Sequence, residues 1–170
     1  TEWLEGNVSK PQELERLLDN IEKLNIREFI LPPNWEKEKN RIYEQYGLKP
    51  GGMRGIRGPV TLATSIFGVE NLIFLIYDEP DLARRFSKAI GDVTIEMAHI
   101  MDKEAGYTLE TAPKGFSFAD DNCALLTDEM YDLFGYPVLK RVFDEFSPNE
   151  GDNRYQHSDS AMEHLLPILG

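Results

Sequence analysis

His157 and Asp159 are separated by one residue, and this spacing suits metal chemistry. In an extended segment, residues i and i+2 point to the same face, so the imidazole and the carboxylate are expected to project into one site. Together they can ligate a divalent metal ion or form an oriented acid–base pair. The spacing alone also allows a loop in which His157, together with Asp159 or Ser160, caps the helix that follows.

Asp120 and Asp121 come directly after the short apolar stretch Gly115–Ala119. Adjacent carboxylates repel each other, and burial would raise the pKa of one of them, as in many general acids and cation sites. We therefore predict catalytic roles for both. The alternative is an Asx turn in which each carboxylate accepts nearby backbone N–H groups.

Arg54 and Arg57 stand out in an acidic chain, and we predict that they meet an anionic ligand, with simple surface solvation as the alternative. The single cysteine, Cys123, is expected to be a small buried hydrophobic residue. The sequence contains no phosphate-binding glycine motif, no G-x-S-x-G nucleophile motif and no H-E-x-x-H zinc motif.

Short strands separated by helices of ten or more residues must position these side chains, which predicts an α/β fold with a parallel sheet. The predicted strands cover residues 28–31, 53–57, 114–119 and 154–157. The predicted helices cover residues 10–24, 35–46, 61–67, 79–105, 127–146 with a bend at Pro137, and 161–169. In parallel α/β folds, function lies beyond the C-terminal ends of the strands, which here are Gly58-Pro59, Asp120-Asp121 and His157-Ser158-Asp159.

Composition narrows the classes of partner. The 170 residues carry 18 Lys+Arg and 30 Asp+Glu, a net charge of −12. Such a surface repels phosphate backbones and anionic lipids, so we expect neither a nucleic-acid nor a membrane partner. One cysteine excludes an internal disulfide framework and indicates a cytoplasmic setting. The apolar runs are far shorter than the ~20 residues that span a bilayer.

Several segments, in this order, resemble the uroporphyrinogen decarboxylase superfamily from about residue 50 to the C-terminus. They are Gly58-Pro59-Val60-Thr61-Leu62-Ala63, the helix starting near Glu79-Pro80, Phe118-Ala119-Asp120-Asp121, residues 136–144, and His157 ahead of Leu165-Leu166. The resemblance implies a TIM (β/α)8 barrel with its active site at the C-terminal mouth. The superfamily includes decarboxylases of haem biosynthesis and zinc-dependent methyltransferases that work with corrinoid proteins or coenzyme M.

The decarboxylase branch matches this chain incompletely. Its members have a tyrosine where this chain has Ser65, and a serine in the loop that here holds Asp121. Their N-terminal arginine and aspartate motifs and their C-terminal histidine motif have no counterpart. The resemblance therefore places Ser65 at a substrate-binding position and weakens the case for porphyrinogen decarboxylation.

The methyltransferase branch binds zinc through a His-x-Cys pair and a further cysteine. His157-Ser158-Asp159 keeps the histidine and replaces the cysteine with a carboxylate. We therefore predict a metal-dependent, methyltransferase-like enzyme that transfers a methyl group to or from a corrinoid protein or a thiol. His157 and Asp159 would bind a metal. Zinc is the candidate that the resemblance gives, but the carboxylate in place of the cysteine leaves the identity of the metal open. Asp120 and Asp121 would orient a small-molecule substrate or protonate a leaving group.

Two alternatives stay open, a uroporphyrinogen decarboxylase of tetrapyrrole synthesis and a non-catalytic binding or structural fragment; a homodimer is also left open. A full barrel needs ~250 residues and eight strands, whereas three or four strands are predicted here. We therefore expect residues 1–170 to form a single domain that is part of a barrel, inactive when isolated from the rest of the enzyme.

Overall fold

The computed structural model describes residues 8–170 and contains one parallel sheet. Its strands are β1 (Gly55–Arg57), β2 (Phe116–Ala119) and β3 (Arg154–His157), and they lie side by side in the order β1-β2-β3. The parallel α/β arrangement expected from the sequence is therefore present. Consecutive strands joined through helices fit part of a uroporphyrinogen decarboxylase-type fold, but the described residues do not close a barrel.

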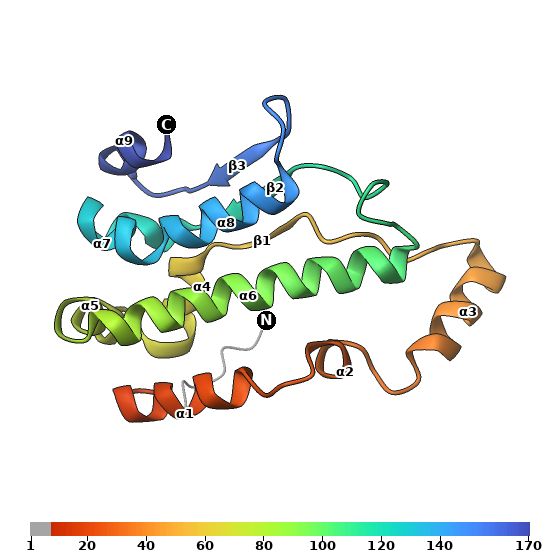
Figure 1. Ribbon diagram of the computed structural model, residues 1–170, viewed down its shortest axis with the longest axis horizontal. Coiled ribbons are helices and arrows are strands. Elements are labelled where there is room, and N and C mark those ends of the chain that lie inside the picture. Colours follow the sequence, from red (N-terminus) through yellow and green to blue (C-terminus); the bar gives the residue numbers. More distant parts are fainter. Residues whose placement is uncertain (1–7) are drawn as a thin grey trace.

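The helices fall into four groups along the chain. Three precede the sheet, three connect β1 to β2, three helical segments connect β2 to β3, and two short ones follow β3 (Figure 1). In order they are α1 (Pro11–Ile21), α2 (Ile26–Ile30) and α3 (Trp35–Tyr46); α4 (Pro59–Phe67), α5 (Val69–Asp78) and α6 (Pro80–Ala105); η1 (Asp121–Leu125), α7 (Asp128–Phe134) and α8 (Tyr136–Phe146); and η2 (Glu163–Leu165) and α9 (Leu166–Leu169).

The strand predicted over residues 28–31 is wrong, because most of this segment belongs to helix α2. The side chain of Asn25 accepts the backbone N–H of Glu28 and begins the helix, and Ile26 is buried. An N-cap of this kind satisfies a donor that a helix start leaves free. The three apolar residues Phe29, Ile30 and Leu31 are compatible with a strand, but the capping contact of Asn25 favours a helix.

Other helix boundaries also differ from expectation. Residues 69–78 form helix α5, which the sequence showed only as an apolar run. The single bent helix predicted over 127–146 is two helices. Helix α7 ends at Phe134, and Pro137 lies in the first turn of α8, where proline needs no N–H partner. The side chain of Thr127 caps α7 by accepting the backbone N–H of Met130.

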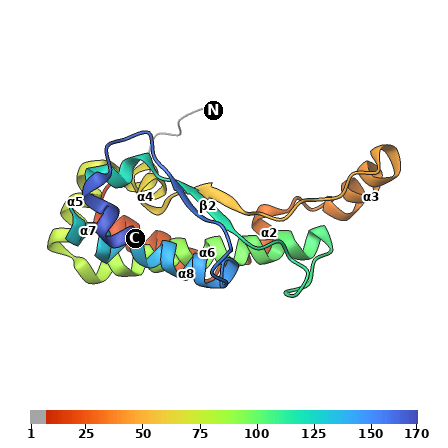
Figure 2. The same cartoon turned by 90° about the horizontal axis from the view of Figure 1, so that it is seen from above.

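One face of the sheet is covered by helices α6 and α8 (Figure 2). Phe116 and Phe118 are buried and pack on Phe146 and Phe143 of α8, with ring centroids 5.5 and 5.6 Å apart. Because successive strand residues alternate between faces, Ala119 and its cross-strand partners point the other way. Arg57, Ala119 and His157 are all exposed, so this second face is open.

The N-terminal helices pack along α6. Leu14 and Leu18 of α1 are fully buried in the core, whereas α3 has no buried residue and projects from one end of the molecule (Figures 1 and 2). Among the described residues no single helix is long and apolar enough to cross a membrane; α4 and α5 reach that length and composition only together, across a bend of 104°.

Candidate functional site

The C-terminal ends of the three strands meet at one edge of the sheet. Arg57 pairs in register with Ala119, and Ala119 with His157. The backbone N–H of Asp120 donates to the carbonyl of His157 at 2.9 Å, so the ladder extends into the turn. The turns that follow carry Gly58, Asp120-Asp121 and Ser158-Asp159, which therefore lie close together as the sequence predicts.

Asp121, His157 and Asp159 form a cluster, which we call the strand-end cluster. One ligand atom from each lies within 4.8 Å of the other two. Nε2 of His157 is 3.2 Å from Oδ1 of Asp159, and Oδ1 of Asp121 accepts the backbone N–H of Asp159 at 2.8 Å. The structure thus brings the predicted metal pair together, and adds Asp121 from the neighbouring strand end.

The cluster is suited to a divalent metal such as zinc. Two ligand atoms about 2.1 Å from one ion, at angles of about 90 to 110°, are about 3.0 to 3.4 Å apart. The 3.2 Å separation between His157 and Asp159 falls in this interval. Their side chains are 47% and 84% exposed, so an ion can reach them from solvent. The donor atoms are nitrogen and oxygen.

Cys123 does not supply a thiolate ligand. Its side chain is fully buried, and its Sγ accepts a hydrogen bond from Nε2 of Gln156 at 3.4 Å. Burial, together with the nearby Asp120 carboxylate, raises the pKa of the thiol to about 11. Cys123 is thus the small buried residue that the sequence indicates, and the site differs from the His-x-Cys sites of the resembling methyltransferases.

This environment predicts an unreactive thiol. At pH 8 a pKa about three units higher leaves about one thiol in a thousand ionised. We expect a thiol reagent to label Cys123 at least about 100-fold more slowly in the native protein than in urea. Equal labelling rates in the two states would contradict the buried placement.

Asp120 is fully buried and lies at the start of helix α4. Its Oδ1 accepts the backbone N–H and the hydroxyl of Thr61 at 2.7 and 2.8 Å, and its Oδ2 accepts the N–H of Val60 at 3.2 Å. Burial raises the pKa of Asp120, and these three donors oppose that shift. The N-cap of helix α4 is Gly58, which has no side chain to accept the free N–H groups of the first turn. Asp120, which follows β2 and is distant in sequence, accepts them instead.

Thr61 and Asn122 extend this contact, and sequence reasoning missed both. The N–H of Asn122 donates to Oγ1 of Thr61 at 3.3 Å, and Nδ2 of Asn122 donates to Oγ1 of Thr64 at 2.7 Å. Ser65 is exposed on the same helix and donates to the carbonyl of Thr61 at 2.7 Å. A threonine two residues after the Gly58-Pro59 turn was the available sequence signal.

The structure separates Arg54 from Arg57. Arg54 precedes β1 at the opposite end of the sheet, where it pairs with Asp102 at 2.6 Å and lies over the ring of Phe146 at 4.9 Å. It is therefore not brought to the strand-end cluster. Arg57 is exposed on the open face of the sheet, in the same cross-strand row as His157, and no ion pair forms with it among the described residues.

The sequence matches one family of known proteins. A family model described as uroporphyrinogen decarboxylase (URO-D) matches residues 53–169, which hold all three strands and the strand-end cluster. No curated protein and no solved structure gives a significant match. Because the matched residues make up more than half of the chain, the chain belongs to the uroporphyrinogen decarboxylase family.

Proposed function

We propose that the chain carries the metal-binding part of a methyltransferase-like enzyme, which transfers a methyl group to or from a corrinoid protein or a thiol. The observation that supports this most is the approach of His157 and Asp159 to 3.2 Å at the C-terminal end of β3, where the methyltransferase branch of the family carries its metal pair. A zinc ion bound there would supply a Lewis acid that favours the thiolate form of a substrate thiol.

Arg57 would hold an anionic group of the substrate. It shares the open face with His157, and the small residue Ala119 lies between them in the row. With strands about 4.8 Å apart, the two outer positions are roughly 10 Å from each other. A substrate with a carboxylate or another anionic group can therefore contact Arg57 while its reacting atom is near His157.

Asp120 would act as a positioning residue. Its carboxylate is occupied by Val60 and Thr61 and has no exposed surface, so it does not reach a substrate in this arrangement. Since Asp121 and Asn122 follow it directly, the contact with α4 fixes where their side chains begin. This role replaces the catalytic one as our proposal for Asp120.

Methyl transfer from methylcobalamin to a thiol tests the proposal. In this reaction the Co–C bond breaks with its electron pair left on cobalt, a C–S bond forms, and the thiol proton passes to solvent. We expect the full-length protein to catalyse it. We expect His157→Ala to lower the rate by at least the about 10- to 100-fold that loss of an outer-shell partner costs, because His157 would be a direct ligand. Cobalamin absorbance reports the reaction directly.

His99→Ala is the matched control. His99 lies on α6 and its imidazole contacts Glu145 at 2.9 Å, remote from the strand ends, so its rate should stay near that of the wild type. A full rate without His157 would rule out the metal role. Release of carbon dioxide from uroporphyrinogen without any methyl transfer would favour the decarboxylase alternative, and no turnover of either substrate would favour the non-catalytic one.

A further inference from the structure

We infer that Asp121 is a third metal ligand, so that the strand-end cluster is a centre of one nitrogen and two carboxylate ligands. The inference rests on the metal role proposed for His157 and Asp159. Asp121 is on a different strand end and would otherwise serve as a substrate-orienting or proton-donating acid. Its assignment as a ligand changes the charge and the donor chemistry of the site.

Geometry is the first argument. Ligand atoms of Asp121, His157 and Asp159 all lie within 4.8 Å of one another. In a tetrahedral zinc site the ligand atoms are roughly 3.4 Å apart, so side-chain rotations that bring these atoms up to about 1.4 Å closer let all three reach one ion. Asp121 offers a second oxygen while its Oδ1 accepts the N–H of Asp159.

Preorganisation is the second argument. The N–H of Asp159 bonds to Asp121, and the N–H of Asp120 bonds to the carbonyl of His157, so the two turns are joined twice. On the other side of the turn, Asp120 is fixed to the start of α4. Metal sites depend on surrounding hydrogen bonds to orient their ligands, and here those bonds come mainly from the backbone.

Charge is the third argument. Asp121 and Asp159 place two carboxylates beside a histidine, and within residues 8–170 no lysine or arginine forms an ion pair with either of them. The contrast within the chain is Glu104, whose carboxylate is surrounded by basic side chains. A divalent cation would neutralise the two carboxylates of the strand-end cluster, and imidazole and carboxylate ligands suit Zn²⁺ and Co²⁺.

Cobalt titration of the full-length protein tests the assignment without any turnover. We expect Asp121→Asn to bind Co²⁺ more weakly than the wild type by at least the about 10- to 100-fold that loss of an outer-shell partner costs. Asparagine keeps an oxygen that can accept the N–H of Asp159, so this change removes the ligand charge while it retains the turn contact. Glu150→Gln, an exposed change of equal charge in the turn before β3, should bind Co²⁺ normally.

Asp121→Cys supplies a spectroscopic readout that a structural role would not produce. If position 121 ligates the ion, the Co²⁺ complex gains a near-ultraviolet thiolate-to-cobalt band that the wild type, with its buried Cys123, lacks. Wild-type cobalt affinity in Asp121→Asn together with no such band in Asp121→Cys would overturn the inference. If those two variants behave this way while His157→Ala abolishes binding, the proposed function survives without it.

Discussion

Replacing Gly58 with alanine is expected to destabilise the protein by more than about 3 kcal/mol. A Cβ at this position would lie 2.1 Å from Cβ and 2.3 Å from Cγ of Asp120. The backbone of Gly58 has a φ of −68°, which any residue adopts, so the requirement is for space and not for conformation. Something must move by more than 1 Å to admit the methyl group.

Neither neighbour can move without losing buried hydrogen bonds. Asp120 holds the N–H groups of Val60 and Thr61, and Gly58 itself donates to the carbonyl of Ala119 at 2.8 Å. Each buried polar group left unsatisfied costs about 1 to 3 kcal/mol, in addition to the strain of overpacking. A shift of the turn would also move Asp121 away from His157 and Asp159, the other two members of the strand-end cluster.

Urea unfolding of the wild type and the variant measures the loss. Gly51→Ala is the matched control, because a Cβ there has no atom within 4 Å, and its midpoint should change little. The two variants differ in the atoms around the new methyl group and not in its chemistry. A Gly58→Ala midpoint as high as that of Gly51→Ala would show that the turn yields easily.

The reason for Gly58 could not be predicted from the sequence around it. The turn and the helix after it were expected from Gly58-Pro59, but the atom that excludes a side chain belongs to Asp120, in another strand. For the same reason the role of Asp120 could not be predicted. Two neighbouring acidic residues suggested catalysis, whereas the carboxylate of Asp120 accepts backbone N–H groups at the start of α4, which is about 60 residues away in sequence.

Spacing along the sequence predicted which residues lie together when they are close in sequence, but it did not predict contacts between residues that are distant in sequence. His157 and Asp159 lie together because an i, i+2 pair is local, and the parallel sheet brings the strand ends to one edge. Arg54 was grouped with Arg57 because only two residues separate them. A strand that begins at Gly55 puts them at opposite ends of the sheet, and Asp102 on α6, which binds Arg54, is distant in sequence.

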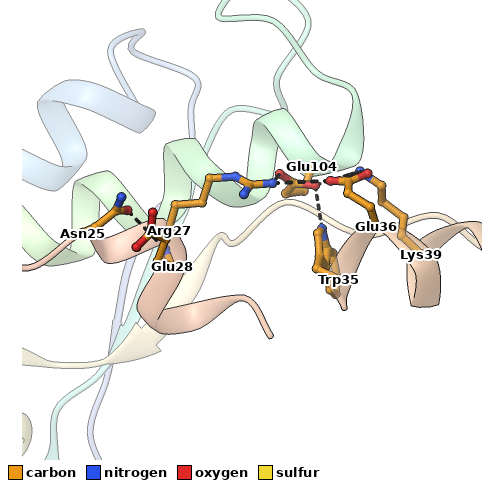
Figure 3. A network of polar contacts seen from close by, with 7 residues as sticks. All are labelled: Asn25, Arg27, Glu28, Trp35, Glu36, Lys39 and Glu104. Atoms are coloured by element: carbon orange, nitrogen blue, oxygen red, sulfur yellow. Dashed lines mark hydrogen bonds and ion pairs between the residues drawn. The ribbon is translucent and has the colours of Figure 1, made fainter. Parts of the chain in front are cut away.

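Glu104 of α6 forms a polar network with helices α2 and α3 (Figure 3). Its side chain is 5% exposed and accepts three hydrogen bonds: from Nη2 of Arg27 at 2.7 Å, from Nε1 of Trp35 at 2.6 Å and from Nζ of Lys39 at 2.9 Å. These donors come from α2 and α3, and α3 has no buried residue of its own. We call this set of contacts the Glu104 clamp.

Glu104→Gln is therefore expected to destabilise the protein by about 1 to 3 kcal/mol, because hydrogen bonds to a charged acceptor are lost while Arg27, 46% exposed, and Lys39, 24% exposed, can rehydrate. The loss should be local. Faster amide hydrogen exchange is expected over residues 26–46, with little change in α6 and α8, because few apolar contacts hold α3 otherwise. Uniformly faster exchange throughout the chain would contradict a local clamp.

The pH dependence of the Glu104 clamp provides an independent test. Burial raises the pKa of Glu104, but hydrogen bonds from Lys39, Trp35 and Arg27 outweigh it and lower the pKa from 4.5 to about 2. A lowered carboxylate pKa means that the stabilisation is complete above about pH 4.5 and is lost as the pH falls toward 2. The fluorescence of Trp35, in a Trp3→Phe background, should follow this loss in the wild type.

Glu36→Gln separates the clamp from general surface charge. Glu36 contacts the same Arg27 and Lys39 but is 63% exposed, and exposed pairs contribute at most about 1 kcal/mol. The Glu36→Gln variant should keep the slow amide hydrogen exchange of residues 26–46 and the acid transition of Trp35 fluorescence. The Glu104→Gln variant should lose that transition. Only the buried carboxylate of Glu104 contacts all three donors, so the two variants should differ. Equal behaviour of the two variants would mean that total charge, and not these contacts, holds α3.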